Sequence, residues 1–168
     1  SELSKKIDFL EKRKDYRKPK LRKSLLIDYI SPINFNKKIN KIILKKRKSK
    51  IVCLTAYSKN IAKILDKYCD IVLVGDSMAN VLYGMDSTHK ITLQTIIQHT
   101  KSVKKGIKKS LLVVDMPKDS YKNIKEAKKN AKLVMNLTKC DAIKLESNQK
   151  NSKIIKELVR HKIPVMGH

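Results

Sequence analysis

Hydrophobic and polar positions alternate regularly along residues 51–168, where short apolar runs are separated by longer segments of helical periodicity. The apolar runs predict strands over residues 50–56, 70–74, 110–115, 141–146 and 163–167. The segments 58–69, 92–107, 122–139 and 150–162 repeat apolar residues every three or four positions and predict amphipathic helices. Ser58 is a suitable N-cap for the first helix, and residues 75–90 are predicted as a loop.

This order of elements predicts an α/β fold with a parallel sheet, because nearly continuous apolar strands are typical of sheets covered on both faces. An open doubly wound sheet and a (β/α)8 TIM barrel both fit. The first strand is not followed by GxGxxG or GxxxxGK[ST], the usual signatures of nucleotide-binding open sheets. The barrel is therefore favoured, with about its first five strands in residues 35–168 and a truncated C-terminus.

Residues 1–50 differ from the rest, since they carry about half of the net charge of +25. Residues 1–34 are basic and poor in apolar positions, which predicts a flexible extension or a surface helix. Residues 33–50 predict a helix with Ile39, Ile42 and Ile43 on one face. This helix would lead into the barrel as a lid or a pedestal.

The high positive charge raises nucleic acid as a partner, because Lys and Arg release counterions when they neutralise phosphates. Lysine, however, greatly outnumbers arginine, and Trp is missing from the chain. Arginine is the residue preferred for contacts with base edges and for bidentate phosphate contacts. We therefore favour a solvated lysine-rich surface and keep a basic nucleic-acid-binding fragment, without catalytic activity, as an alternative.

The compartment follows from what the sequence lacks. It contains neither an apolar run of about 18 residues nor a signal-peptide pattern, so we expect a cytoplasmic protein without a membrane span. Cys53, Cys69 and Cys140 have no CxxC spacing and border apolar runs. We expect all three to be reduced and structural.

Three successive strands end in an acid: Asp76 follows IVLVG, Asp115 ends LLVVD, and Glu146 ends AIKLE. Neighbouring parallel strands lie about 4.8 Å apart, so these carboxylates meet at the rim where barrel enzymes carry out chemistry. Clustered carboxylates repel one another, and a hard cation such as Mg²⁺, which prefers oxygen ligands, relieves that repulsion. The sequence predicts a Mg²⁺ site formed by the three acids.

Lys144 strengthens this hypothesis, because a residue two positions before Glu146 points to the same face of its strand, while Leu145 points to the other. A cation beside the metal suits a substrate carboxylate, and Ser77 adds a hydroxyl and a backbone N–H for the same anion. His89 and His99 are expected on the surface or on a helix face, not as ligands.

Each acid alone also has a purely structural explanation. Asp76 suits a turn, Asp115 a strand end, and Glu146 a helix cap. The three together, with a lysine beside them, favour a functional site over three separate structural roles.

Several stretches together resemble the ketopantoate hydroxymethyltransferase (3-methyl-2-oxobutanoate hydroxymethyltransferase) family in order and spacing over about residues 35–168. They are LTAYSKNIAKILD, DIVLVGDSMANVLYGMDSTHKITLQTIIQHTKSVKKG, LLVVDMPKDSY, AIKLE and IPVMGH. The resemblance implies a homo-oligomeric (β/α)8 barrel that binds Mg²⁺. It also implies transfer of a one-carbon unit from 5,10-methylenetetrahydrofolate to 3-methyl-2-oxobutanoate, through an enolate stabilised by Mg²⁺. The product is 2-dehydropantoate, on the route to pantothenate.

The resemblance also implies roles for individual residues. Metal ligands are implied at Asp76, Asp115 and Glu146, and substrate contacts at Asp76, Ser77, Asp115 and Lys144. The chain differs from the family at Ser147 and Asn148, which replace glycines, and at Lys118, which replaces a hydrophobic residue.

The family's catalytic base would lie beyond His168, so we expect residues 1–168 alone to be inactive. Another Mg²⁺-dependent barrel that acts as a C–C lyase or mutase on 2-oxo acids, such as the phosphoenolpyruvate mutase and isocitrate lyase group, is the nearest alternative.

Overall fold

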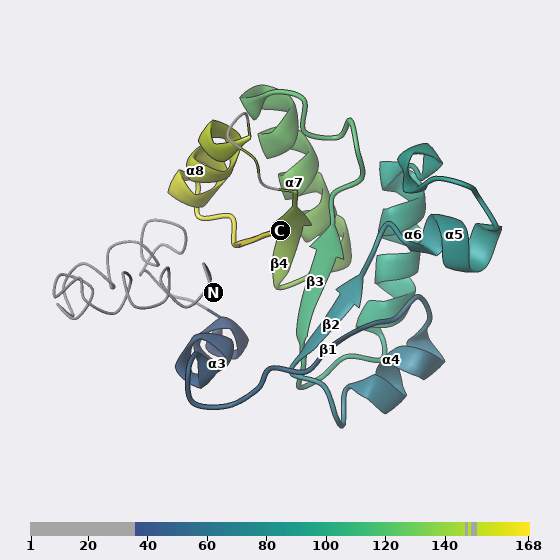
Figure 1. Ribbon diagram of the computed structural model, residues 1–168, viewed down its shortest axis with the longest axis vertical. Coiled ribbons are helices and arrows are strands. Elements are labelled where there is room, and N and C mark those ends of the chain that lie inside the picture. The colour runs from purple at the N-terminus through teal and green to yellow at the C-terminus, as the bar shows by residue number, and fades with distance from the viewer. Residues whose placement is uncertain (1–35, 147, 149–150) are drawn as a thin grey trace, which may run out of the picture.

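A computed structural model describes residues 36–146, 148 and 151–168 of the chain (Figure 1). The predicted extension at 1–34 lies outside these residues. The described part forms one parallel five-stranded sheet, in which each strand pairs with its neighbours in sequence. The strands are β1 (Cys53–Thr55), β2 (Ile71–Val74), β3 (Leu111–Asp115), β4 (Ala142–Leu145) and β5 (Val165–Gly167). The sequential order is that of a (β/α) barrel and confirms the predicted fold class.

The helices alternate with these strands as the sequence predicts. They are α3 (Lys37–Lys45), α4 (Lys59–Leu65), α5 (Met78–Tyr83), α6 (Leu93–Lys104), α7 (Ile124–Thr138) and α8 (Ser152–Arg160), with a 3-10 helix η2 (Thr88–Lys90). The predicted loop at 75–90 therefore contains α5 and η2. Gly84 ends α5 in the left-handed conformation, with φ of 59°, which a glycine adopts without a Cβ penalty.

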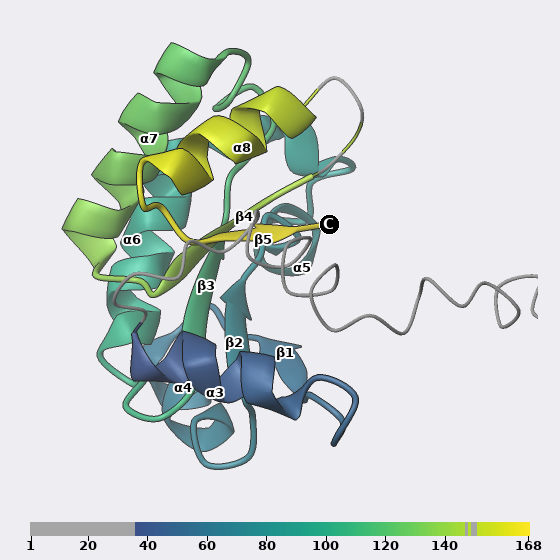
Figure 2. The same ribbon diagram turned by 90° about the vertical axis from the view of Figure 1, so that its left-hand side faces the viewer.

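The two faces of the sheet bury different residues, as the alternation of side chains along a strand requires. Leu112, Val114 and Leu145 belong to the large core that the sheet shares with α4, α6, α7 and α8. Leu111 and Val113 belong to a smaller core on the opposite face, together with residues of α3. Figure 2 shows α6, α7 and α8 gathered along one side of the sheet. The predicted orientation of Leu145 toward the helices is confirmed.

Strand β1 is shorter and more exposed than predicted. The prediction covered residues 50–56, whereas only Cys53–Thr55 pair with β2, and all three residues are exposed. In the described part of the chain, β1 has a partner on one side only. Cys53 is therefore exposed, although Cys69 and Cys140 are buried, and all three cysteines are free as predicted. Ser58 occupies the N-cap position of α4 without a side-chain capping bond.

Helix α3 is a pedestal at the amino ends of the strands, on the side away from the acidic strand ends (Figure 1). Ile39 is buried against the sheet, while Ile42 and Ile43 are partly buried. The Lys38 ammonium donates to the Ser110 carbonyl oxygen at 2.8 Å and lies 3.4 Å from the Asp141 carboxylate. These contacts place the predicted apolar face of the helix on the sheet.

Asp66 and Asp141 fix the start of β3. The Asp66 carboxylate accepts backbone N–H groups from residues 108–110 at 2.8 to 3.1 Å, and the Asp141 carboxylate accepts the Leu112 N–H at 2.9 Å. Burial alone would raise the pKa of Asp66, but the backbone donors from Ser110, Lys109 and Lys108 hold it below its usual value.

The described residues contain no helix long and apolar enough to cross a membrane.

Candidate active site

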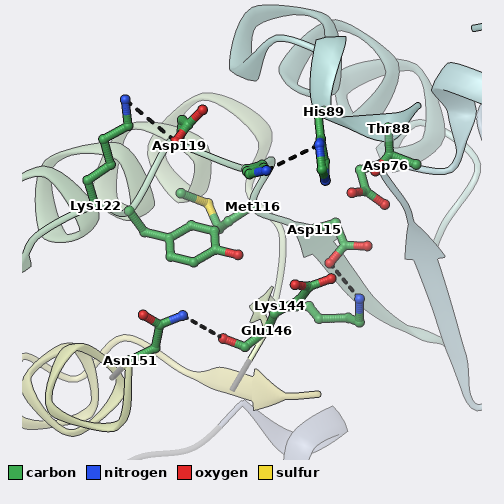
Figure 3. Close-up of a pocket in the computed structure, with 12 residues that line it drawn as sticks. Asp76, Thr88, His89, Asp115, Met116, Asp119, Lys122, Lys144, Glu146 and Asn151 are labelled. Carbon is green, nitrogen blue, oxygen red and sulfur yellow. Dashed lines mark hydrogen bonds and ion pairs between the residues drawn. The ribbon is translucent and has the colours of Figure 1, made fainter. Parts of the chain in front are cut away.

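A cavity of about 340 Å³ opens at the carboxyl ends of the strands (Figure 3). It is lined by Asp76, Thr88, His89, Asp115, Met116, Lys118, Asp119, Tyr121, Lys122, Lys144, Glu146 and Asn151. The structure thus brings the three predicted metal ligands and the predicted lysine to one cavity. They come from the ends of β2, β3 and β4, because the sequential strand order places these ends side by side.

Asp115 and Lys144 are the most buried charged pair of the site. They are register partners across β3 and β4, and the Lys144 ammonium donates to Asp115 Oδ1 at 2.8 Å. The two side chains are 14% and 9% exposed for Lys144 and Asp115, respectively. Burial raises the pKa of the Asp115 carboxyl, although the Lys144 ammonium opposes this effect and the negative charge of Asp76 adds to it. The carboxylate is therefore held in a place where a further positive charge would stabilise it.

Glu146 is exposed at the end of β4, and Asn151 contacts its backbone. The Asn148 side chain accepts the Asn151 N–H at 2.9 Å, and the Asn151 amide donates to the Glu146 carbonyl oxygen at 3.3 Å. Ser147 lies outside the described residues. Glu146 does not act as the cap of α8, whose N-cap is Asn151.

Ser77 lies beside the cavity and is not one of the residues that line it. It occupies the N-cap position of α5 without a side-chain capping bond. Its hydroxyl is instead 2.8 Å from the Tyr57 hydroxyl. The predicted substrate contact at Ser77 stays a prediction.

Several cavity residues were not anticipated by the sequence analysis. His89, expected on the surface, is exposed and also lines the cavity, where its Nδ1 lies 3.2 Å from the Lys118 ammonium. Tyr121 also lines the cavity, and its pKa is raised, first by burial and then by the charge of Glu146. His89 and Tyr121 lie in non-periodic segments, so only their place shortly after the sequences DST (residues 86–88) and MP (residues 116–117) could have indicated them. His99, expected on a helix face, is hydrogen-bonded from α6 to Tyr57.

The donor set suits Mg²⁺ in kind, because it offers carboxylate oxygens in a cavity that can also admit water. The described side chains do not, however, place three His, Cys, Asp or Glu residues close enough together to hold a metal ion as they lie. Lys144 is the cation beside Asp115 in this arrangement. The assignment of Asp76, Asp115 and Glu146 as metal ligands therefore stays a prediction.

Fold and site together define a parallel α/β barrel segment with acids and a lysine at the carboxyl ends of its strands. Solved structures support the fold. A 2,3-dimethylmalate lyase of the PEP mutase/isocitrate lyase superfamily aligns with a TM-score of 0.57 and 13% identity, over 77% of this chain and 51% of that one. An oxaloacetate acetylhydrolase aligns with a TM-score of 0.57 and 12% identity, over 78% and 50%. At such identities the likeness concerns the fold alone.

The sequence comparison is more specific. A family profile described as ketopantoate hydroxymethyltransferase matches residues 36–168, and the chain belongs to that family. A 3-methyl-2-oxobutanoate hydroxymethyltransferase of Pelagibacter ubique (strain HTCC1062) is 61% identical over 133 residues, which are 79% of this chain and 52% of the relative. One of Anaplasma marginale (strain Florida) is 49% identical over 124 residues, or 74% and 45%. The chain spans about half the length of these relatives.

Proposed function

We propose that the protein catalyses hydroxymethyl transfer from 5,10-methylenetetrahydrofolate to 3-methyl-2-oxobutanoate, giving 2-dehydropantoate for pantothenate synthesis. The observation that carries this proposal is the convergence of Asp76, Asp115, Glu146 and Lys144 on one cavity in a chain of this family. Family membership also favours this reaction over a lyase or mutase and over nucleic-acid binding. A cytoplasmic homo-oligomer belongs to the same proposal.

The cavity supports a small anionic substrate. Its volume of about 340 Å³ is at the lower end of ligand sites, which suits a five-carbon 2-oxo acid better than a large ligand. The Lys144 ammonium is the cation that would attract the substrate carboxylate, and its contact with Asp115 fixes where it points. The folate donor would approach from the exposed side of the cavity, where Lys118 and Lys122 lie.

Asp76, Asp115 and Glu146 would hold Mg²⁺. When bound, the ion would act as a Lewis acid that polarises the 2-oxo group and so acidifies the C3 proton. Asp115 is suited to such a role because its buried carboxylate lies beside a second acid, Asp76, whose charge disfavours its ionisation without additional cations. A phosphonopyruvate hydrolase of similar fold, with a TM-score of 0.55 and 10% identity, was solved with oxalate and Mg²⁺.

Exchange of the C3 proton of 3-methyl-2-oxobutanoate in deuterated water tests this proposal with the complete gene product. We expect exchange, followed by ¹H NMR, to require Mg²⁺ and to stop when EDTA is added. Asp115→Ala should abolish it, whereas Glu126→Ala, a change in the first turn of α7, should not. Product formation with 5,10-methylenetetrahydrofolate then tests the transfer step. Exchange that is equal with and without Mg²⁺ would contradict the metal assignment, and no turnover of this substrate would contradict the function.

A further inference from the structure

The hydroxyl of Ser77 does not cap the helix that follows it. Serine at an N-cap usually accepts a backbone N–H of the first helical turn, yet Ser77 makes no such bond to α5. Its Oγ is 2.8 Å from the Tyr57 hydroxyl instead. Tyr57 follows β1 and Ser77 follows β2, and these neighbouring strands bring the two side chains together at the carboxyl end of the sheet.

The glycine before Asp76 keeps this hydroxyl close to the acids. A Cβ placed on Gly75 would lie 3.0 Å from Ser77 Oγ and 3.7 Å from Asp115 Oδ2. The serine hydroxyl and the Asp115 carboxylate therefore both approach the space that the missing side chain leaves open. A Cβ at this position would push the serine hydroxyl by a few tenths of an ångström and so disturb its hydrogen bond with Tyr57.

Tyr57 is also held through its backbone. Its carbonyl oxygen lies 2.8 Å from His99 Nδ1, and because a carbonyl only accepts, this nitrogen carries the hydrogen. In the neutral ring, His99 Nε2 is then an acceptor, and the Tyr83 hydroxyl donates to it at 2.8 Å. These contacts join the loop after β1 to α6 and to the last residue of α5. They fix the position of the Tyr57 backbone.

We propose that Tyr57 is a positioning residue of this site, which holds the Ser77 hydroxyl as a hydrogen-bond donor to the carboxylate of the substrate. The inference rests on the proposed function, since it requires an anionic substrate that reaches Ser77 from the cavity that its neighbour Asp76 lines. Only one hydrogen lies between the two hydroxyl oxygens. When the Ser77 hydroxyl donates to an anion, the hydrogen bond between the two hydroxyls must be donated by Tyr57. The phenol therefore orients the serine without touching the substrate.

The test measures the affinity of the complete gene product for 3-methyl-2-oxobutanoate with Mg²⁺ by calorimetry, together with KM and kcat. We expect Tyr57→Phe to weaken binding by about threefold to tenfold, as the loss of one hydrogen bond predicts, and to raise KM more than it lowers kcat. Tyr68→Phe is the matched control, because this tyrosine is 74% exposed and does not line the cavity. It should bind as the parent does.

A double-mutant cycle separates positioning from general loss of structure. Ser77→Ala should weaken binding to a similar degree, and adding Tyr57→Phe to it should cause almost no further loss. Independent, additive effects would overturn the inference. Gly75→Ala gives a second route that leaves both hydroxyls in the chain. It should also weaken binding, and parental affinity in this variant would contradict the geometry.

Failure of the inference differs visibly from failure of the proposed function. A parent protein that binds the substrate, together with a Tyr57→Phe variant of equal affinity and KM, would overturn the role of Tyr57 alone. A parent protein that neither binds nor converts 3-methyl-2-oxobutanoate would overturn the function and the inference with it.

Discussion

Acidic residues stand at both ends of the same sheet, but their surroundings differ. At the amino ends, Asp66 accepts three backbone N–H groups, Asp70 pairs with Lys45, and Asp141 contacts Lys38 and a backbone N–H of β3. At the carboxyl ends, Asp115 pairs with Lys144. Among the described residues, the carboxylates of Asp76 and Glu146 take part in no ion pair.

The difference teaches how the two sets of acids are used. The amino-end carboxylates accept hydrogen bonds from other residues of the fold, and each of them holds a loop or the helix α3 in place. The carboxyl-end carboxylates keep capacity for a ligand, and the charge of Asp76 disfavours ionisation of the buried Asp115. Charged groups without a partner in the fold are expected at functional sites. Substitutions at the two ends should therefore affect different properties.

Asp66→Ala should have the largest effect and should act on stability. It would leave three backbone donors without their acceptor, one of them the buried Ser110 N–H, at a cost of about 3 kcal/mol in the free energy of unfolding. Urea denaturation followed by circular dichroism measures this. Asp86→Ala, at an exposed loop acid, is the control for stability. Unfolding at the parental urea concentration would show that the loop before β3 does not depend on Asp66.

Glu146→Gln should act on activity instead. Loss of a charge at the proposed metal site should lower kcat/KM by about 10²-fold, equivalent to about 2.7 kcal/mol, while the exposed side chain leaves stability within about 0.5 kcal/mol of the parent. Steady-state kinetics and urea denaturation on the same preparation check both values. A variant that is destabilised but fully active would reverse the contrast between the two ends.

The acids at the two ends of the sheet should contribute to the pH dependence of stability with opposite signs. The pKa values of Asp66 and Asp70 are lowered in the fold, so their contribution is present above the unfolded value of about 3.9 and is lost as pH falls through the folded pKa values. The pKa of Asp115 is raised, so its contribution is present at low pH and is lost as pH rises through the folded value.

The free energy of unfolding, measured from pH 2 to pH 7, should therefore fall steeply below about pH 4. In Asp66→Asn the total loss on acidification should be smaller by about 1 to 2 kcal/mol. Asp115→Asn should leave this acid limb intact. Identical acid limbs in the parent and in Asp66→Asn would mean that Asp66 is not held by the backbone donors as described.

Lys45→Met should have the smallest effect. It removes the ammonium that lowers the pKa of Asp70, but the lysine side chain is 30% exposed and Asp70 still accepts the Val52 N–H at 3.0 Å. We expect a loss of about 0.5 to 1 kcal/mol at low salt and less at 0.5 M NaCl, because solvent and salt screen such pairs. Equal losses at both salt concentrations would point to packing of the lysine stem instead of charge.

Much of the fold could be predicted because buried parallel strands are apolar throughout, and helices show their period in sequence. The period of two along β4 also placed Lys144 and Leu145 on opposite faces correctly. The cavity was predicted only where its residues end strands, as Asp115 does. His89 and Tyr121 were missed because they lie in connecting segments, whose path depends on tertiary contacts and not on periodicity. The bond from Tyr57 to Ser77 likewise depends on how two loops meet.

The unequal burial of the strands also has a consequence for how the sheet opens. All five residues of β3 are buried, whereas β1 is exposed throughout and β5 is at best partly buried. Amide hydrogen exchange reports local opening, and its free energy rises with burial and contact density. In the described sheet, protection should therefore be greatest in β3 and decline toward β1 and β5, so that Asp115 stands on the slowest-exchanging strand.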